Sequence, residues 1–228
     1  MRYDFREKAV ESGLAALALL SLAVLAGIVF YLFREGLPVF ASTGFLDFIF
    51  GTDWYPVGDQ PDFEIGSLIA GSLAVTFLAS LFAVPLGLMT AAYLSEVAAN
   101  TTRRIIKPFI ELLAALPSVV IGFIGMVLVA PWLQNTLGIA TGLNLFNAAL
   151  MLAFMAVPTI CSIAEDALHA VPRSLKDASL ALGATPWETL KNVTFPYALS
   201  GVGTAVMLGM SRALGETMVV LMVAGGAA

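Results

Sequence analysis

The stretch from Glu165 to Pro196, EDALHAVPRSLKDASLALGATPWETLKNVTFP, is a polar island with an apolar run of membrane-spanning length on each side. Pro172 suits the start of a helix and Gly183 suits the position just past the end of one, which predicts a short helix over 172–182. The four residues 185–188, Thr-Pro-Trp-Glu, have the form of a capping box that opens a second helix. The island therefore predicts two short helices that meet at a turn on the membrane surface.

The composition is that of an integral membrane protein. Of 228 residues, 59% are hydrophobic and 12% are charged, whereas a soluble domain carries roughly a quarter charged residues. The apolar runs are much longer than strands require, so we expect an all-α, polytopic transmembrane helical bundle. The net charge of -5 says little about partners, because charge in such a protein is sorted by side of the membrane.

Five apolar runs predict five spans in a single transmembrane domain over residues 1–228. The spans are expected at about 13–33, 67–94, 112–132, 143–163 and 197–223. Between them we expect an extracytoplasmic loop over 34–66 and a cytoplasmic loop over 164–196. An odd number of spans leaves the last one without a returning partner, so we expect a sixth span that this sequence does not contain.

The basic residues gather in three segments that lie on one side of these spans. They are Arg2, Arg6, Lys8, Arg103, Arg104, Lys107, Arg173, Lys176 and Lys191. The opposite side has only Arg34, beside Asp47, Asp53, Asp59, Asp62 and Glu64. The positive-inside rule therefore predicts that the N-terminus and the polar island lie in the cytoplasm.

Arg212 and Glu216 are the ionisable residues expected deep inside a span. A start near Tyr197 puts Arg212 roughly 22 Å into a hydrocarbon core of about 30 Å. Glu216 follows four residues later on the same helix face, so the two side chains can pair. One interpretation is an ion pair that locks helix packing; the other is an anion contact in a polar pathway, joined by the hydroxyls of Thr217 and, after Pro117, Ser118.

The chain offers little for catalysis or metal binding. Its one histidine, His169, and its one cysteine, Cys161, lie in different settings, so they form neither a coordination shell nor a catalytic dyad. The sequence has no Gly-rich Lys-Ser/Thr loop to cradle a nucleotide. We therefore expect no enzymatic activity and no cofactor in this chain, and any ATP that drives it would be hydrolysed by another subunit.

The polar island resembles the cytoplasmic loop of ABC importer permeases, whose motif is Glu-Ala-Ala, three residues, Gly, nine residues, Ile, any residue, Leu, Pro. Here it reads Asp177-Ala178-Ser179, then Gly183, then Val193, Phe195 and Pro196, with every gap matched. In that family the loop inserts into a groove on the ATP-binding subunit, and the bundle is of the MetI-like, type I kind. The resemblance implies an ATPase-docking loop that includes Asp177, Ala178, Gly183, Trp187 and Pro196.

The stretch over 211–220, SRALGETMVV, resembles the Gly-Arg-Ala-Leu-Gly-Glu-Thr-Met-Ala-Val of phosphate-importer permeases of the PstC type. Further similarity covers 50–56, 112–125 and 155–171. The resemblance implies a multi-pass subunit of a bacterial inner-membrane importer that moves inorganic phosphate by alternating access. Its implied partners are a PstA-like second permease, two ATP-binding subunits, an extracytoplasmic phosphate-binding protein and the lipid membrane, with no nucleic acid.

Two alternatives stay open. Molybdate, tungstate and sulfate permeases are similar through the Arg, Gly and Glu of the 211–220 stretch, so the cargo could be another oxyanion. In a non-transporting membrane scaffold, Arg212 and Glu216 would only lock helices. For a transporter, Pro196 lies 16 residues before Arg212, so we expect a push at the loop to travel along one continuous span to the anion contact.

Overall fold

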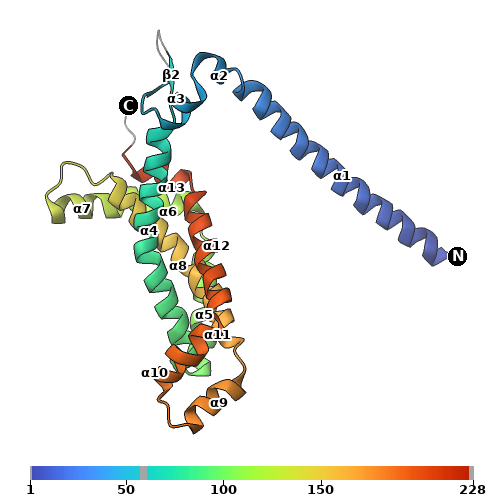
Figure 1. Cartoon of the computed structure of the whole chain (residues 1–228), viewed down its shortest axis with the longest axis vertical. Helices are drawn as coiled ribbons and strands as arrows, with labels where there is room; N and C mark the ends of the chain where they lie inside the picture. Colours follow the sequence, from blue (N-terminus) through green and yellow to red (C-terminus); the bar gives the residue numbers. More distant parts are fainter. Residues whose placement is uncertain (1, 57–60, 226–228) are drawn as a thin grey trace. The chain divides into compact units, whose positions relative to one another are not determined.

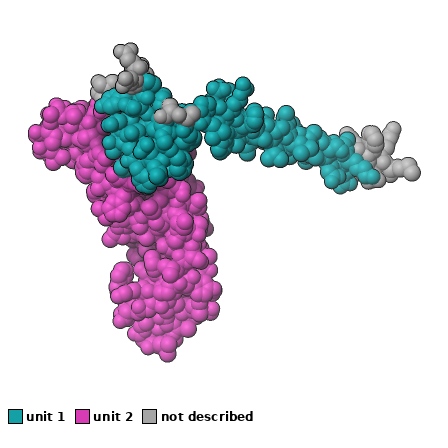
Figure 2. All heavy atoms as spheres, turned by 45° about the horizontal axis from the view of Figure 1, so that its top comes forward, with its two compact units in different colours: residues 1–70 teal, residues 71–228 magenta. Residues whose placement is uncertain are grey.

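The computed structural model of the chain describes residues 2–56 and 61–225. It is helical almost throughout (Figure 1), which confirms the predicted all-α membrane fold. The described chain forms two compact units, Met1–Ala70 and Gly71–Ala228 (Figure 2). The single domain expected over 1–228 stays a prediction.

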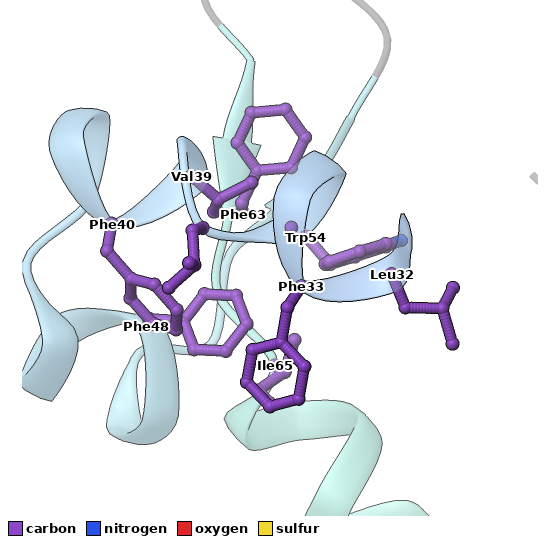
Figure 3. Close-up of a pocket in the computed structure, with 10 residues that line it drawn as sticks. Leu32, Phe33, Val39, Phe40, Phe48, Trp54, Phe63 and Ile65 are labelled. Atoms are coloured by element: carbon purple, nitrogen blue, oxygen red, sulfur yellow. The ribbon is translucent and has the colours of Figure 1, made fainter. Parts of the chain in front are cut away.

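The first unit combines one long helix with a small aromatic cap. Its elements are α1 (Arg2–Gly36), α2 (Val39–Ser42), α3 (Phe45–Phe50), the antiparallel strands β1 (Trp54–Tyr55) and β2 (Asp62–Phe63), and the start of α4 (Gly66–Ala92). Side chains of α1 are exposed from residue 7 to its end. The end of α1 and the cap enclose an apolar pocket of about 480 Å³, with Phe40, Phe48 and Trp54 in its wall (Figure 3).

The second unit holds the remaining helices. In chain order they are α4 continuing into the π-helical turn η1 (Tyr93–Val97), α5 (Asn100–Ala114), α6 (Ser118–Ile124), the π-helical turn η2 (Gly125–Val129), α7 (Ala130–Leu137), α8 (Leu145–His169), α9 (Arg173–Ala181), α10 (Pro186–Thr189), the π-helical turn η3 (Leu190–Thr194), α11 (Phe195–Tyr197), α12 (Leu199–Leu214) and α13 (Met218–Val223). By length and composition, four described helices can cross a membrane, or five if the bent pair α10–α12 counts as one span.

Helix α8 is the centre of the second unit and packs against α4, α5, α12 and α13 (Figure 1). Its Ile160 is fully buried, and a Cβ added at Gly87 of α4 or at Gly209 of α12 would lie within 3 Å of that side chain. Small residues at these two positions let both helices approach α8 closely. Two apolar clusters follow one another along α8, and the second surrounds Ala164 and Leu168 near its C-terminal end.

The helix boundaries differ from the expected spans at three places. Residues 112–114 end α5, and the third apolar helix starts only at Ser118, because Pro117 interrupts the chain. Helix α8 continues to His169, so the first residues of the expected loop 164–196 belong to a helix. The expected span 197–223 is not one helix: it bends by 74° at its start and is interrupted between Leu214 and Met218.

Candidate anion site and docking surface

The polar island folds as the capped hairpin that the sequence predicts. Pro172 is the N-cap of α9, and Gly183, with φ of +89°, follows the cap at the other end in the left-handed region. The Thr185 side chain accepts from the Glu188 amide while Glu188 accepts from the Thr185 amide, which completes the capping box of α10. We call residues 172–196 the docking hairpin.

The docking hairpin presents apolar side chains to its surroundings. Leu182 is 89% exposed and Trp187 is 69% exposed, and Leu175 and Leu180 are also exposed. Large exposed apolar side chains that gather on one surface mark an interaction site. The predicted docking residues Asp177, Ala178, Gly183, Trp187 and Pro196 are all exposed as well.

Polar contacts hold the hairpin together and attach it to the end of α4. The hydroxyls of Ser179 and Thr189 lie 2.9 Å apart between its two helices. Lys176 Nζ donates to Glu96 Oε1 of η1 at 2.6 Å and to the Leu168 carbonyl at 3.4 Å. A cavity of about 580 Å³ lies between the hairpin and η1. The first helix of the hairpin is therefore fastened to η1 by an ion pair, while the end of the hairpin packs on the second apolar cluster through Phe195.

The carboxylate of Glu188 completes this local structure. Hydrogen bonds from the Thr185 amide and hydroxyl lower the pKa of Glu188, because they stabilise its ionised form. The group is fully exposed, so its contribution is confined to the start of α10.

A buried carboxylate lies where α8 enters the docking hairpin. Glu165 is 1% exposed, its Oε2 accepts from Lys107 Nζ at 2.7 Å, and its Oε1 pairs with Arg103. Lys107 also pairs with the exposed Asp166, and Arg103 Nη1 donates to a ring nitrogen of His169 at 3.0 Å. We call these five residues the Glu165 cluster. It binds α5 to α8.

The pKa of Lys107 reports the same arrangement. Partial burial alone would lower that pKa, but the hydrogen bonds and charges of Asp166 and Glu165 outweigh burial and raise it above its usual value of 10.5. Lys107 is therefore held in its charged form beside a buried carboxylate. The negative charge of Glu165 is thus paired with two cations, Arg103 and Lys107.

Arg212 lies at the opposite end of α5, in the last turn of α12. Its Nη2 donates to the main-chain oxygen of Ala114 at 2.9 Å, while its buried Nε has no hydrogen-bond partner. Ala114 is the last residue of α5, where helix carbonyls lack partners within the helix. The guanidinium thus bridges two helix ends and keeps donors that protein groups do not use.

The predicted ion pair between Arg212 and Glu216 does not form, as the charged pairs of the described chain include neither residue. Glu216 Oε1 instead accepts from the amides of Met218 and Val219, at 3.2 and 3.5 Å, and caps α13. The prediction of pairing was wrong because it required a continuous helix, and α12 ends between the two residues. Arg212 is left without a carboxylate partner.

Ser118 and Thr217 both stand at helix starts. Ser118 is the first residue of α6, and Thr217 directly precedes α13. These two helices pack closely and run in the same direction, as the order of their contacts shows: Gly122 with Val219, then Gly125 with Val223. The two helix starts therefore lie at the same end of the packed pair. The structure records no hydrogen bond between the predicted side chains themselves.

The Glu165 cluster and the Ala114 carbonyl were missed in the sequence. Arg103 and Lys107 are four residues apart, which places them on one helix face, and this spacing was the available signal. Their partner Glu165 lies 58 residues away from Lys107, and no local pattern joins them. A main-chain acceptor such as the Ala114 oxygen has no sequence signature, since any residue could supply it.

Comparisons with known proteins agree with this architecture. The sequence pattern of the family "Binding-protein-dependent transport system inner membrane component" matches residues 83–228. The probable ABC transporter permease protein YqgH of Bacillus subtilis is 40% identical over 212 residues, which cover 92% of this chain and 69% of that protein. The phosphate transport system permease protein PstC of Mesorhizobium japonicum is 34% identical over an alignment of 245 residues, gaps included, that covers 99% of this chain and 74% of that protein.

A solved structure shares the fold. An inward-facing form of the MetNI methionine ABC transporter superposes with a TM-score of 0.57 at 25% identity. The match covers 66% of this chain and 72% of that chain. The likeness agrees with the MetI-like bundle expected from the docking-loop motif.

Proposed function

We propose that this chain, which belongs to the family of binding-protein-dependent transport system inner membrane components, is the transmembrane subunit of an importer for inorganic phosphate. The similarity to the phosphate permease of Mesorhizobium japonicum supports phosphate as the cargo. So does the SRALGETMVV stretch, which places Arg212 at a helix break.

The observation that carries the proposal is the state of Arg212. A guanidinium has five N–H donors in a planar fork that fits the oxygens of phosphate. Within the described residues, this guanidinium makes one hydrogen bond, to the Ala114 oxygen, and pairs with no carboxylate. Leaving such a group inside a bilayer costs on the order of 2.5 to 3.5 kcal/mol. An arriving anion would recover part of that cost through charge-assisted hydrogen bonds.

Glu216 has a different role from the one expected. In its capping position it is not paired with Arg212, so it does not block the guanidinium. We propose that it lines the pathway together with Thr217 and Ser118 and competes with phosphate as the anion passes. Such competition would keep the anion from binding too tightly to leave.

Transport in this proposal requires partners. The docking hairpin would insert into an ATP-binding subunit through Trp187 and the exposed residues around Gly183, and a second permease subunit would complete the pathway. An extracytoplasmic binding protein would deliver phosphate. The basic residues near the N-terminus, on α5 and on the hairpin support an orientation with the hairpin in the cytoplasm.

Phosphate uptake by the assembled importer tests the proposal. We expect Arg212→Gln to lower uptake by about 10- to 100-fold, since hydrogen bonds to charged groups contribute about 1.5 to 3 kcal/mol. Arg104→Gln is the matched control, because Arg104 is an exposed cation of α5 with no charged partner in the described chain. Wild-type uptake in Arg212→Gln would refute the pathway role.

Competition experiments separate phosphate from the other oxyanions. An excess of unlabelled phosphate should abolish uptake of labelled phosphate, and equal concentrations of molybdate, tungstate or sulfate should leave it unchanged. Equal inhibition by one of these three would assign the site to another tetrahedral oxyanion.

A further inference from the structure

Helix α5 is attached at both ends to parts of the molecule that the proposed function uses. In its first half, Arg103 and Lys107 pair with the buried Glu165 near the base of the docking hairpin. At its last residue, the Ala114 oxygen accepts from Arg212. The 11 residues between Arg103 and Ala114 span about 16 Å at the rise of an α-helix. One rigid element therefore joins the hairpin base to the anion contact.

The hairpin has a second attachment to this element. Lys176 of α9 pairs with Glu96 in η1, and only two residues separate η1 from α5. The apolar side chains of Ile106 and Ile110 pack α5 onto the cluster around Ala164 and Leu168. Both ion pairs and apolar packing thus fix α5 to the end of α8.

The direct route along the chain is less suited to carry motion. The sequence predicts one continuous span from Pro196 to Arg212, but α11 and α12 meet at Ala198, and the helix pair that includes them is bent by 74°. A displacement of the hairpin is redirected at this bend before it reaches α12. Helix α5 is continuous from Arg103 to Ala114, with Pro108 inside it.

We propose that α5 is the strut that transmits movement of the docking hairpin to Arg212, and that Glu165 is the positioning residue that fixes the strut to the hairpin base. This inference rests on the proposed transport function. When the hairpin moves, α8 and its Glu165 move with it. Because Glu165 pairs with Arg103 and Lys107, α5 moves too, and the Ala114 oxygen at its far end shifts relative to Arg212. Breaking the hydrogen bond between Arg212 and the Ala114 oxygen would change the affinity of the guanidinium for an anion.

Glu165→Gln is the decisive variant. Gln keeps the shape of Glu165 and one acceptor oxygen, but it removes the charge and replaces the other oxygen with an NH2 donor; the two cations, which are 21% and 25% exposed, can still reach water. In proteoliposomes with the complete importer, we measure phosphate uptake and ATP hydrolysis in the same vesicles. We expect ATP hydrolysis to persist while phosphate moved per ATP falls by about tenfold, within the range of reported coupling energies.

Asp166→Asn is the matched control. Asp166 is exposed and also pairs with Lys107, but in Asp166→Asn the buried Glu165 keeps both of its cations, so α5 stays joined to α8 through Glu165. We expect its ratio of phosphate to ATP to match the wild type. A purely structural role for Glu165 would lower uptake and hydrolysis together and leave the ratio unchanged, and that result would overturn the proposal.

A second variant covers the case in which Glu165→Gln does not assemble. Lys107→Met removes one cation, but Arg103 still pairs with Glu165, so we expect a smaller loss of folding stability. We expect a smaller fall in the same ratio, and an unchanged ratio in an assembled Lys107→Met importer would also overturn the proposal. Absence of phosphate uptake by the wild-type importer would instead refute the transport function itself.

Discussion

Glu165 of α8 and Arg212 of α12 are two charged residues that contact different parts of helix α5. The protein groups around them differ. Glu165 is 1% exposed and pairs with two cations, Arg103 at Oε1 and Lys107 at Oε2. Arg212 is partly buried, makes one hydrogen bond to a main-chain oxygen and has a buried Nε without a partner. Both charges cost free energy to bury, but only one has been compensated by protein groups.

The difference indicates what each charge is for. A buried charge with complete pairing cannot accept a ligand without breaking the fold, so Glu165 suits a fixed joint. A buried charge with unused donors is incomplete until something binds it, so Arg212 suits a ligand contact. The sequence alone shows that Arg212 lies inside an apolar run and that Glu165 lies at the end of one, but it does not show which of the two charges has partners, because the cations that pair with Glu165 lie about 60 residues away in the chain.

The largest expected effect comes from removing both partners of Glu165. In the double variant Arg103→Ala and Lys107→Ala, a carboxylate stays buried without compensation. We expect the free energy of unfolding in mixed micelles to fall by about 3 to 5 kcal/mol.

The control for this variant removes two exposed cations, Arg104→Ala with Arg173→Ala. Neither has a charged partner in the described chain, and we expect a change of less than about 0.5 kcal/mol. Equal losses in the two double variants would mean that Glu165 does not depend on its partners, and the comparison with Arg212 would fail.

A smaller effect on stability is expected at Arg212. Arg212→Met replaces the guanidinium with an apolar side chain of similar length, and it removes one hydrogen bond together with the cost of an uncompensated charge. We expect unfolding free energy to change by less than about 1 kcal/mol, in either direction, while phosphate uptake is lost. A loss of 3 kcal/mol or more would favour the scaffold interpretation, in which Arg212 locks helix packing.

Much of the fold follows from local chemistry in the sequence. The capping box at Thr185 and the left-handed Gly183 were predicted because each depends on residues within one turn of the chain. Apolar length predicted five spans, and the described chain has four helices long and apolar enough to cross a membrane, or five if the bent pair counts as one span. The amphipathic helix α5 was missed, since its polar first half reads as loop and its apolar end reads as the start of the next span.

The site was predictable only in part. Arg212 was recognised as costly inside a membrane, which needs only its position in an apolar run. Its true partner is a main-chain oxygen 98 residues away, and the expected partner Glu216 is separated from it by the helix end at Leu214. Contacts of this kind depend on how helices pack, and periodicity within one helix does not contain that information.

The smallest expected effect concerns Glu188, a fully exposed charge that can be compared with the buried Glu165 and the partly buried Arg212. Thr185→Ala removes the cap of α10 and should cost about 1 kcal/mol of local helix stability, or roughly a fivefold loss of amide protection. Thr185→Ser keeps the hydroxyl and should keep most of the protection. Amide hydrogen exchange of the docking hairpin, with the rest of the chain as internal reference, measures both.

The pH dependence of the same amides tests the role of the carboxylate. The folded pKa of Glu188 lies below the ordinary value of 4.5, so its stabilisation is present above pH 4.5 and is lost as the pH falls through the lowered folded value. Glu188→Gln keeps a side-chain acceptor but does not titrate, so the loss of protection in this acidic range should disappear. If the wild type and Glu188→Gln lose protection alike on acidification, the exposed carboxylate contributes nothing, and charge matters in this hairpin only at the ion pair of Lys176 with Glu96.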